Sequence, residues 1–183
     1  MSKFSKFKRY LMLLAIVPLL GFMAVSCALT VPPTGTVEVH VTDAGHSSNV
    51  TSINITASAV EIHRAGGNES EWVPLEITNY TFDLIALRDG GLEQLLAQEN
   101  VTAGNYTQIR MTIEKVEVTL NGETKNATVP SGELKFVRPF DVVEGQTTIL
   151  TLDFDADQLV TVTGDGEVLV RPVATLNVTM PSE

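Results

Sequence analysis

Residues 50–64 read VTSINITASAVEIHR, and apolar residues alternate with polar ones along this stretch. Ile53 and Ala57 share one parity, whereas Val60 falls on the other. Successive side chains of a β-strand point to opposite faces, so this change of phase predicts a β-bulge or a strand that bends between two sheets. The same flip occurs in residues 109–120, IRMTIEKVEVTL. Two long bent strands predict a β-sandwich.

Alternation and turn signals predict further strands on both sides of these two. The first begins at Gly35, where Val37 and Val39 face one way and the residues between them face the other. Further strands are expected at residues 72–77, 80–87, 133–137, 147–154, 159–163 and 168–180. Pro172 lacks a backbone donor, which favours an edge position or a bulge in the last strand. Asn121-Gly122 is the clearest hairpin signal.

A single short helix is expected at residues 91–99, where Leu92, Leu95 and Leu96 share one helical face. It is too short to be stable alone and would pack at one end of the strands. The fold class is therefore all-β, an antiparallel β-sandwich with one short helix.

The N-terminus has the layout of a secretory signal peptide. Four basic residues within the first nine precede the uncharged, mostly apolar residues 11–25. That run ends at AVSC, residues 24–27, which resembles the lipobox of prokaryotic lipoproteins; the resemblance implies that Cys27 becomes a lipidated first residue. A plain signal peptidase site and an uncleaved anchor are the alternatives. We expect a signal helix in residues 1–26, a short lipid-anchor linker in 27–34 and one sandwich domain in 35–183.

Charge restricts the partners of the exported part. Four of the 12 Lys and Arg residues lie in the leader, so the remainder carries eight basic against 22 acidic residues, a net charge of −14. Such a surface repels phosphate backbones, and we expect no nucleic acid partner. The membrane is expected to be reached through the lipid anchor or the N-terminal helix.

Eight of the nine asparagines begin the N-glycosylation sequon Asn-x-Ser/Thr. With 31 Ser and Thr among 183 residues, chance would give roughly 1.5 sequons. N-glycosylation takes place outside the cytoplasm, so the sequons favour an extracytoplasmic, archaeal-type surface protein anchored to the outer face of the cell membrane. Alternation predicts that Asn54 and Asn177 point outward. The eight acceptors are Asn49, Asn54, Asn68, Asn79, Asn100, Asn105, Asn126 and Asn177.

Three strings carry a family resemblance: GTVEVHVTDA from Gly35, AGNYTQIRMTI from Ala103 and TLDFDAD from Thr151. They resemble a domain family of unknown function found in archaeal and bacterial surface lipoproteins. The resemblance implies an extracytoplasmic, carbohydrate-binding-like or prealbumin-like Greek-key sandwich, with no established activity and no catalytic residues.

The most specific polar cluster is Asp153, Asp155 and Asp157. On an extended strand these carboxylates would project from one face about 6–7 Å apart and could hold Ca²⁺. A solvated acidic strand end is the alternative, and otherwise no cofactor is expected. Trp72 and Tyr106 are the candidates for stacking against a sugar ring, with the protein core as the alternative for Trp72.

These features predict a non-enzymatic surface domain with a structural or adhesive role, whose partners are cell-surface glycans or surface-layer proteins. The alternatives are an extracytoplasmic carbohydrate-binding module, Ca²⁺-assisted or not, and a hydrolase. Asp43, His46 and Ser47 would be the acid, base and nucleophile of such a hydrolase, but no Gly-x-Ser-x-Gly elbow accompanies them.

Overall fold

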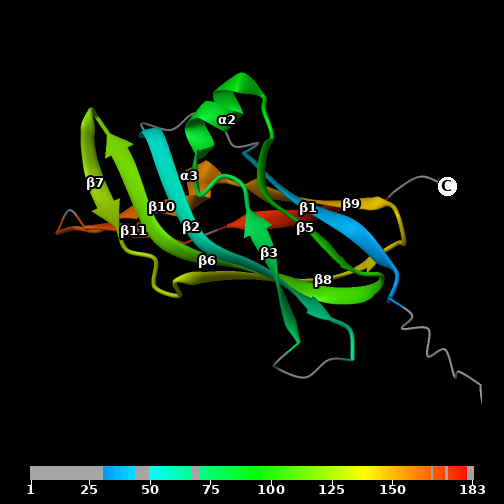
Figure 1. Cartoon of the computed structure of the whole chain (residues 1–183). Helices are drawn as coiled ribbons and strands as arrows, with labels where there is room; N and C mark the ends of the chain where they lie inside the picture. The colour runs from blue at the N-terminus through cyan, green and yellow to red at the C-terminus, as the bar shows by residue number, and fades with distance from the viewer. Residues whose placement is uncertain (1–30, 44–49, 67–70, 166, 172, 181–183) are drawn as a thin grey trace, which may run out of the picture. The chain divides into compact units, whose positions relative to one another are not determined.

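The computed structural model describes residues 31–43, 50–66, 71–165, 167–171 and 173–180. Residues Pro32–Glu183 form one compact unit. The expected signal helix, Cys27, His46, Ser47, Asn49, Asn68 and Pro172 lie outside the described residues. The elements, drawn in Figure 1, are β1 (Thr34–Asp43), β2 (Val50–Arg64), β3 (Trp72–Ile77), β4 (Thr81–Asp83), α2 (Leu84–Gly90), β5 (Gln94–Thr102), β6 (Gly104–Leu120), β7 (Glu123–Ala127), β8 (Glu133–Val142), β9 (Thr147–Phe154), α3 (Ala156–Leu159), β10 (Val160–Val162), β11 (Val168–Val170) and β12 (Ala174–Thr179).

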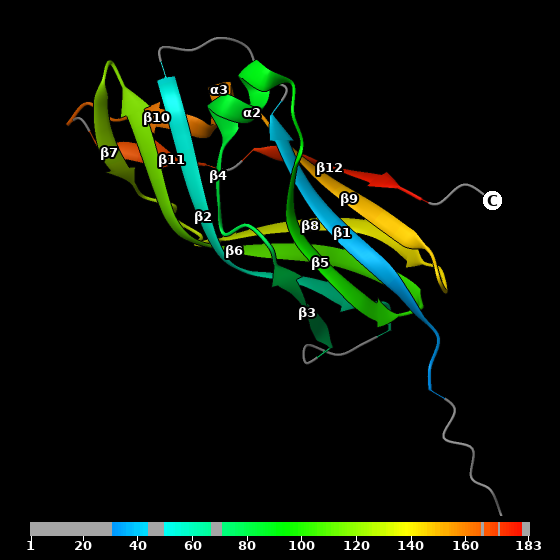
Figure 2. The same cartoon turned by 45° about the horizontal axis from the view of Figure 1, so that its top comes forward.

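Ten of the strands form one curled sheet in the order β12-β9-β1-β5-β3-β2-β6-β7, with β4 added to β2 and β8 added to β6. In Figure 2, β5, β1 and β9 lie side by side, and β6 and β8 cross beneath them. Strands β10 and β11 make a separate two-stranded ribbon. The predicted all-β, sandwich-like fold is confirmed.

One ladder departs from the expected antiparallel arrangement. Strand β9 pairs with β1 in parallel, with Thr147 opposite Thr36 and Phe154 opposite Asp43. The turn between β8 and β9 returns the chain to the beginning of β1, where Thr36 N donates to Gln146 O at 2.8 Å. Both strands therefore start at the same end. Alternation in the sequence defines faces but not partner direction, so the prediction was wrong for this pair.

The bend predicted from the phase flips is confirmed and is shared by β2 and β6. Thr56 lies opposite Lys115 and Ala57 opposite Ile113, which leaves Glu114 unpaired in β6. The next pair in the ladder is Ala59 with Thr112, which leaves Ser58 unpaired in β2. Both extra residues are exposed. Because the two bulges face each other, both strands change phase together and bend as one unit.

The predicted helix at residues 91–99 is wrong, because most of this stretch is strand β5. The helix α2 lies earlier, from Leu84 to Gly90, and replaces the second half of the expected strand 80–87, of which only β4 is extended. The Asp83 carboxylate begins it by accepting from Ile85 N at 3.0 Å and Ala86 N at 3.4 Å. Gly91, at φ 60°, ends it by donating to Arg88 O. A glycine in this conformation terminates a helix instead of starting one.

Two other expected features differ in outcome. Asn121 and Gly122 have φ of 51° and 82° and join Leu120 to Glu123 in a two-residue hairpin, which confirms the turn signal. The single strand expected at residues 168–180 is instead two strands in different sheets, β11 and β12.

Large aromatic side chains fill the space between the layers. Phe82 and Phe154 are buried with ring centroids 5.9 Å apart. Tyr106 and Phe140 stack at 5.5 Å on the other side of the bend. Burial of one such side chain contributes about 1.5–3 kcal/mol. This core holds the domain without a disulfide, since the chain has a single cysteine.

Candidate functional site

The glycosylation sequons lie mainly along strands. Five of the six described acceptors stand on β2, β5, β6, β7 and β12, and Asn79 follows β3. In three of the strand sequons the middle residue is fully buried, as with Ile55, Val101 and Tyr106. Alternation then turns the acceptor and its Ser/Thr partner to the outer face. The described acceptors with exposed side chains are Asn79, Asn100, Asn105, Asn126 and Asn177.

Asn54 is the least exposed of the described acceptors; the amide nitrogens of Asn79 and Asn105 also donate, to Leu95 O and Asp141 Oδ1, but those side chains are exposed. The Asn54 side chain is half-buried, and its amide nitrogen, the atom that would carry a glycan, donates to Ser52 Oγ at 2.9 Å. Strands β4 and β6 flank it on either side, with Asp83 and Glu117 opposite. The outward parity expected for Asn177 is confirmed by its exposure, while Asn54 is outward but enclosed.

The three aspartates of residues 153–157 do not form the expected ladder. Strand β9 ends at Phe154, and Asp155 caps the short helix α3 by accepting from Gln158 N at 3.3 Å. Asp157 lies in the first turn of that helix. The chain stops being extended within the motif, so alternation no longer sets the direction of its carboxylates. Among the described residues no three His, Cys, Asp or Glu side chains are placed to hold a metal ion.

The expectation that Tyr106 stacks against a ligand is wrong. Its side chain is 1% exposed, packs on Phe140, and donates its hydroxyl to Thr102 O at 2.8 Å. Because Asn105 on one side of it is exposed, the alternation of β6 directs Tyr106 into the core.

Burial raises the pKa of the Tyr106 phenol above its ordinary value of about 10, and the nearby Arg64 charge acts in the opposite direction. The folded state therefore holds the phenol in its neutral form. The resulting stabilisation is present below pH 10 and is lost as pH rises from 10 through the higher folded pKa.

We expect Tyr106→Phe to lower the free energy of unfolding by about 1–2 kcal/mol at pH 8, because Thr102 O loses its donor. The substitution also removes the ionisable group, so the variant should lose less stability than the native chain between pH 9 and 11. Urea unfolding at both pH values measures this, and Tyr80→Phe, at a tyrosine 58% exposed, is the control. Equal pH dependence in the native chain and Tyr106→Phe would contradict the assignment.

Trp72 lies on the outer face of the sheet at the start of β3 and is half-buried. The Arg110 guanidinium carbon stands 4.2 Å and Lys135 Nζ 5.3 Å from its ring centroid. The His63 ring meets it edge-on, with centroids 4.9 Å apart. We call Trp72, His63, Arg110 and Lys135 the Trp72 platform. It gathers the indole of Trp72, the imidazole of His63 and the cationic groups of Arg110 and Lys135 from four strands on one surface.

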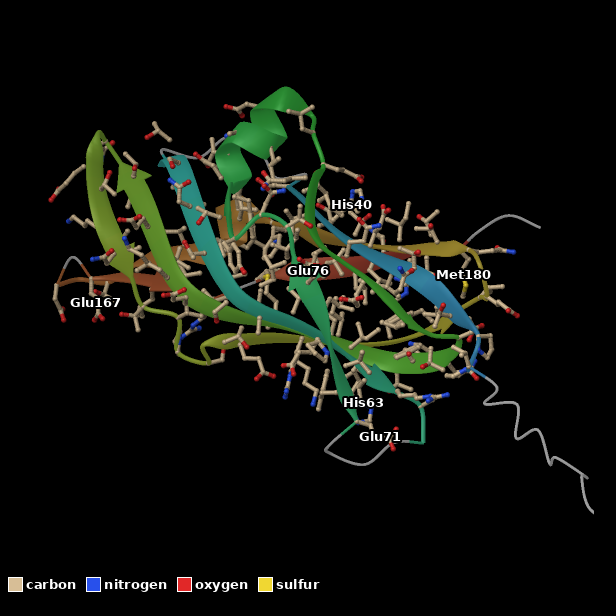
Figure 3. All side chains as sticks on the ribbon, in the orientation of Figure 1. His40, His63, Glu71, Glu76, Glu167 and Met180 are labelled. Atoms are coloured by element: carbon tan, nitrogen blue, oxygen red, sulfur yellow. The ribbon has the colours of Figure 1, made fainter. Side chains whose placement is uncertain are left out.

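The sheet register positions the platform. Arg110 of β6 lies opposite Lys135 of β8 and opposite Glu61 of β2, and its Nε donates to Glu61 Oε2 at 2.6 Å. His63 lies opposite Trp72 in the ladder between β2 and β3. Figure 3 labels His63 beside Glu71, at the end of β2 and the approach to β3. The platform exists only because β2 pairs with both β3 and β6, and β6 pairs with β8.

His40 lies away from the platform, on β1. Its ring contacts two carboxylates, with Nε2 3.1 Å from Glu38 Oε2 and Nδ1 3.7 Å from Glu93 Oε2. His40 is therefore surrounded by acidic side chains and is no part of the platform.

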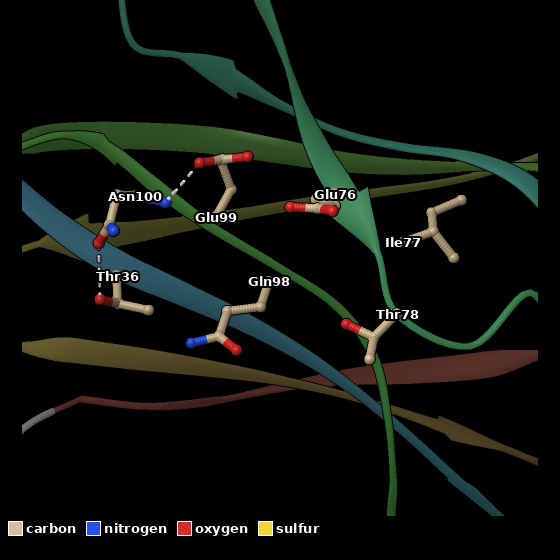
Figure 4. Close-up of a pocket in the computed structure, with 7 residues that line it drawn as sticks. All are labelled: Thr36, Glu76, Ile77, Thr78, Gln98, Glu99 and Asn100. Carbon is tan, nitrogen blue, oxygen red and sulfur yellow. Dashed lines mark hydrogen bonds between the residues drawn. The ribbon is translucent and has the colours of Figure 1, made fainter.

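A hollow of about 500 Å³ opens on the outer surface where β3 and β5 diverge (Figure 4). These strands pair only through Glu76 with Gln98 and Ile77 with Ala97. Beyond that point the Asn100 N–H donates to the carboxylate of the preceding Glu99 at 2.9 Å. A charged side chain at an unpaired strand segment discourages the addition of another strand. The lining residues are Thr36, Glu76, Ile77, Thr78, Gln98, Glu99 and Asn100.

These observations define the class: an all-β domain built on one curled mixed sheet, with sequon asparagines on the outer faces of its strands. The chain belongs to the family described as Domain of unknown function (DUF4382), whose model matches residues 34–172. The predicted resemblance to a domain family of unknown function is thereby confirmed.

Two solved structures are similar to this chain. One is a candidate cell adhesion protein (BF2867) of Bacteroides fragilis, with 12% identity and a TM-score of 0.39 over 82% of this chain and 47% of that one. The other is a leucine-rich repeat protein of Bacteroides thetaiotaomicron, with 12% identity and a TM-score of 0.25 over 64% of this chain and 13% of that one. This chain thus spans less than half of either protein. No curated protein matches the sequence. Within the described residues, no helix is long and apolar enough to cross a bilayer.

Proposed function

We propose that this chain is a glycosylated, non-enzymatic domain of the cell surface with a structural or adhesive role. The observation that carries the proposal is the orientation of the sequons. Acceptors on separate strands, such as Asn100, Asn126 and Asn177, direct their side chains to solvent. An oligosaccharyltransferase needs such access to the acceptor amide, and the attached glycans then cover the outer faces of the sheet.

The proposed location is the outer face of the cell membrane, with the chain held through a lipid on Cys27. The signal layout and the AVSC string support this anchor. The acidic surface of the exported part keeps the domain soluble close to the membrane and disfavours adsorption to anionic headgroups.

Glycopeptide mapping of the native protein tests the first part of the proposal. We expect hexose-containing additions at Asn79, Asn100, Asn126 and Asn177. We expect the lowest occupancy at Asn54, because its side chain is half-buried between β4 and β6 whereas those of the other described acceptors are exposed. A native mass without any sugar additions would contradict glycosylation, and Asn54 occupied as fully as Asn126 would contradict the role of access.

The anchor is tested by substitution of one residue. Cys27→Ser should move the chain from the membrane fraction to the medium if Cys27 carries the lipid, and Ser26→Ala is the control. A chain that stays in the membrane fraction after Cys27→Ser would indicate an uncleaved N-terminal helix instead.

A second function, an extracytoplasmic carbohydrate-binding module, is favoured by the Trp72 platform. Sugar-binding surfaces commonly combine an accessible aromatic ring with polar side chains that hydrogen-bond hydroxyls. The outer sheet face, where the half-buried Trp72 ring lies beside Arg110 and Lys135, supplies an aromatic ring and polar groups together. This function is compatible with an adhesive role.

A further inference from the structure

We infer that the Trp72 platform binds acidic carbohydrate, specifically short oligosaccharide segments whose pyranose rings carry carboxylates. The inference deepens the carbohydrate-binding alternative and rests on the proposed surface location only for access to such a ligand. Its support comes from the Trp72 indole, the charged side chains around that indole and the positions of the described sequons.

Two exposed apolar side chains, Val137 and Pro74, border the platform. Val137 of β8 follows Phe136 and is 75% exposed. It lies opposite Gln108 of β6. Pro74 is also exposed, two residues beyond Trp72 along β3. A pyranose ring has an apolar face of C–H groups that packs on indole and aliphatic surface. The platform and its border therefore fit a sugar ring lying along the sheet.

The charge at the platform favours an anionic sugar over a neutral one. Four of the eight described Lys and Arg side chains form an ion pair with an acid, as in Lys115–Glu117 and Lys125–Glu123. Within the described part of the chain, Lys135 forms no such ion pair, although its side chain is exposed and its ammonium stands over the indole. A ligand carboxylate can pair with this ammonium without displacing a protein carboxylate.

The described sequon asparagines lie off the platform. The six described acceptors stand on other rows of the sheet, and none lies on the rows that join Lys135, Arg110 and Glu61 or Gln108, His63 and Trp72. Glycans on these six acceptors would therefore start outside the platform, whereas Asn68, in the segment between β2 and β3, lies outside the described residues.

The net charge of the exported part limits the ligand to short segments. At physiological ionic strength the Debye length is about 8 Å, so a few sugar residues feel mainly the local cations. A long polyanion, such as a polynucleotide or the face of an anionic bilayer, would also meet the 22 acidic residues spread over the rest of the chain. Oligosaccharide segments are therefore favoured over these polymers.

Intrinsic fluorescence reports on this site directly, since Trp72 is the single tryptophan of the chain. The full chain is titrated with tetragalacturonic acid and, as the neutral counterpart, with the same oligomer after reduction of its carboxyls. We expect a saturable change in tryptophan emission with a Kd of about 1 mM or lower for the acid oligomer. The neutral oligomer should bind about tenfold more weakly, because it lacks the partner for Lys135.

Matched variants separate binding at the platform from general charge effects. Lys135→Gln should weaken binding of the acid oligomer about tenfold, and Lys125→Gln, the same change on β7, should leave it unaltered. Trp72→Phe, followed by chemical-shift changes of backbone amides, should bind more weakly while its melting temperature stays close to that of the native chain.

Three results would overturn the inference: no emission change up to about 10 mM, equal binding of the acidic and neutral oligomers, or equal losses in Lys135→Gln and Lys125→Gln. None of them would alter the glycopeptide map or the Cys27→Ser fractionation, so failure of this inference is distinguishable from failure of the proposed function.

Discussion

Asp83→Ala is expected to lower the free energy of unfolding by about 2–4 kcal/mol. The Asp83 carboxylate joins helix α2 to strand β2. Its Oδ1 accepts from Ile53 N at 3.1 Å and from the first turn of α2, and its Oδ2 accepts from Ser52 Oγ at 2.8 Å. Loss of an N-cap costs about 1 kcal/mol, and leaving a buried backbone donor such as the Ile53 N–H unpaired costs a further 1–3 kcal/mol.

Urea unfolding followed by circular dichroism measures this loss. Asp89→Ala is the matched control, because Asp89 lies on the same helix with a side chain 67% exposed and pairs only with the neighbouring Arg88 among described residues. A surface pair of this kind contributes about 0–1 kcal/mol. Asp83→Asn, which keeps one acceptor oxygen, should fall between the two. Equal midpoints for Asp83→Ala and Asp89→Ala would contradict the joint role.

The helix shows why the same residues misled prediction from sequence. Asp83 and Gly91 are ordinary cap residues, and they bracket α2 as caps should. The leucine spacing in residues 92–96 outweighed them, since it matches one face of a helix. In the structure the ladder of β1 and β5 skips Leu96, so the adjacent Leu96 and Ala97 are both buried. A β-bulge disturbs period-two alternation and can imitate helical spacing.

The bend in β2 and β6 could be predicted because bulges there leave an unambiguous trace. Ile53 and Val60 must both face the core, so the parity of the apolar residues changes where Ser58 is inserted. The sequence of a single strand does not show which strand it pairs with or in which direction. The parallel pairing of β1 with β9 was therefore not predictable. Alternation specifies faces, whereas tertiary packing selects neighbours.

The candidate site likewise has one part that the sequence could predict and one part that it could not. Parity within the sequon Asn105-Tyr106-Thr107 was enough to direct Tyr106 inward, and the structure buries it. Trp72 is not flanked by a sequon that would indicate its direction. Its partial exposure depends on its position as the first residue of β3. Its neighbours Arg110 and Lys135 come from strands 38 and 63 residues further along the sequence. Their convergence required the paired sheet and could not be read from spacing.

Gly35→Ala is the second substitution with a large expected effect, a loss of about 3 kcal/mol in the free energy of unfolding. A Cβ at this position would lie 2.3 Å from the carbonyl oxygen of Val143 and 2.8 Å from Val142 Cγ1. Backbone atoms cannot rotate away as a flexible side chain can, so the start of β1 would have to separate from the turn after β8. Inserting one carbon into such packing costs about 1–3 kcal/mol, and sometimes more.

The separation would also break backbone hydrogen bonds that hold this turn, Thr36 N to Gln146 O at 2.8 Å and Gly145 N to Thr34 O at 2.9 Å. These bonds fix the point from which β9 runs parallel to β1, so Gly35→Ala should weaken that ladder before the rest of the sheet. Hydrogen exchange should therefore accelerate first at residues 36–43 and 147–154. Gly164→Ala is the control, because nothing lies within 4 Å of its added Cβ, and its unfolding free energy should change by less than about 0.5 kcal/mol. If Gly35→Ala and Gly164→Ala unfold at the same urea concentration, the close approach of Val143 O is not what requires glycine at position 35 of β1.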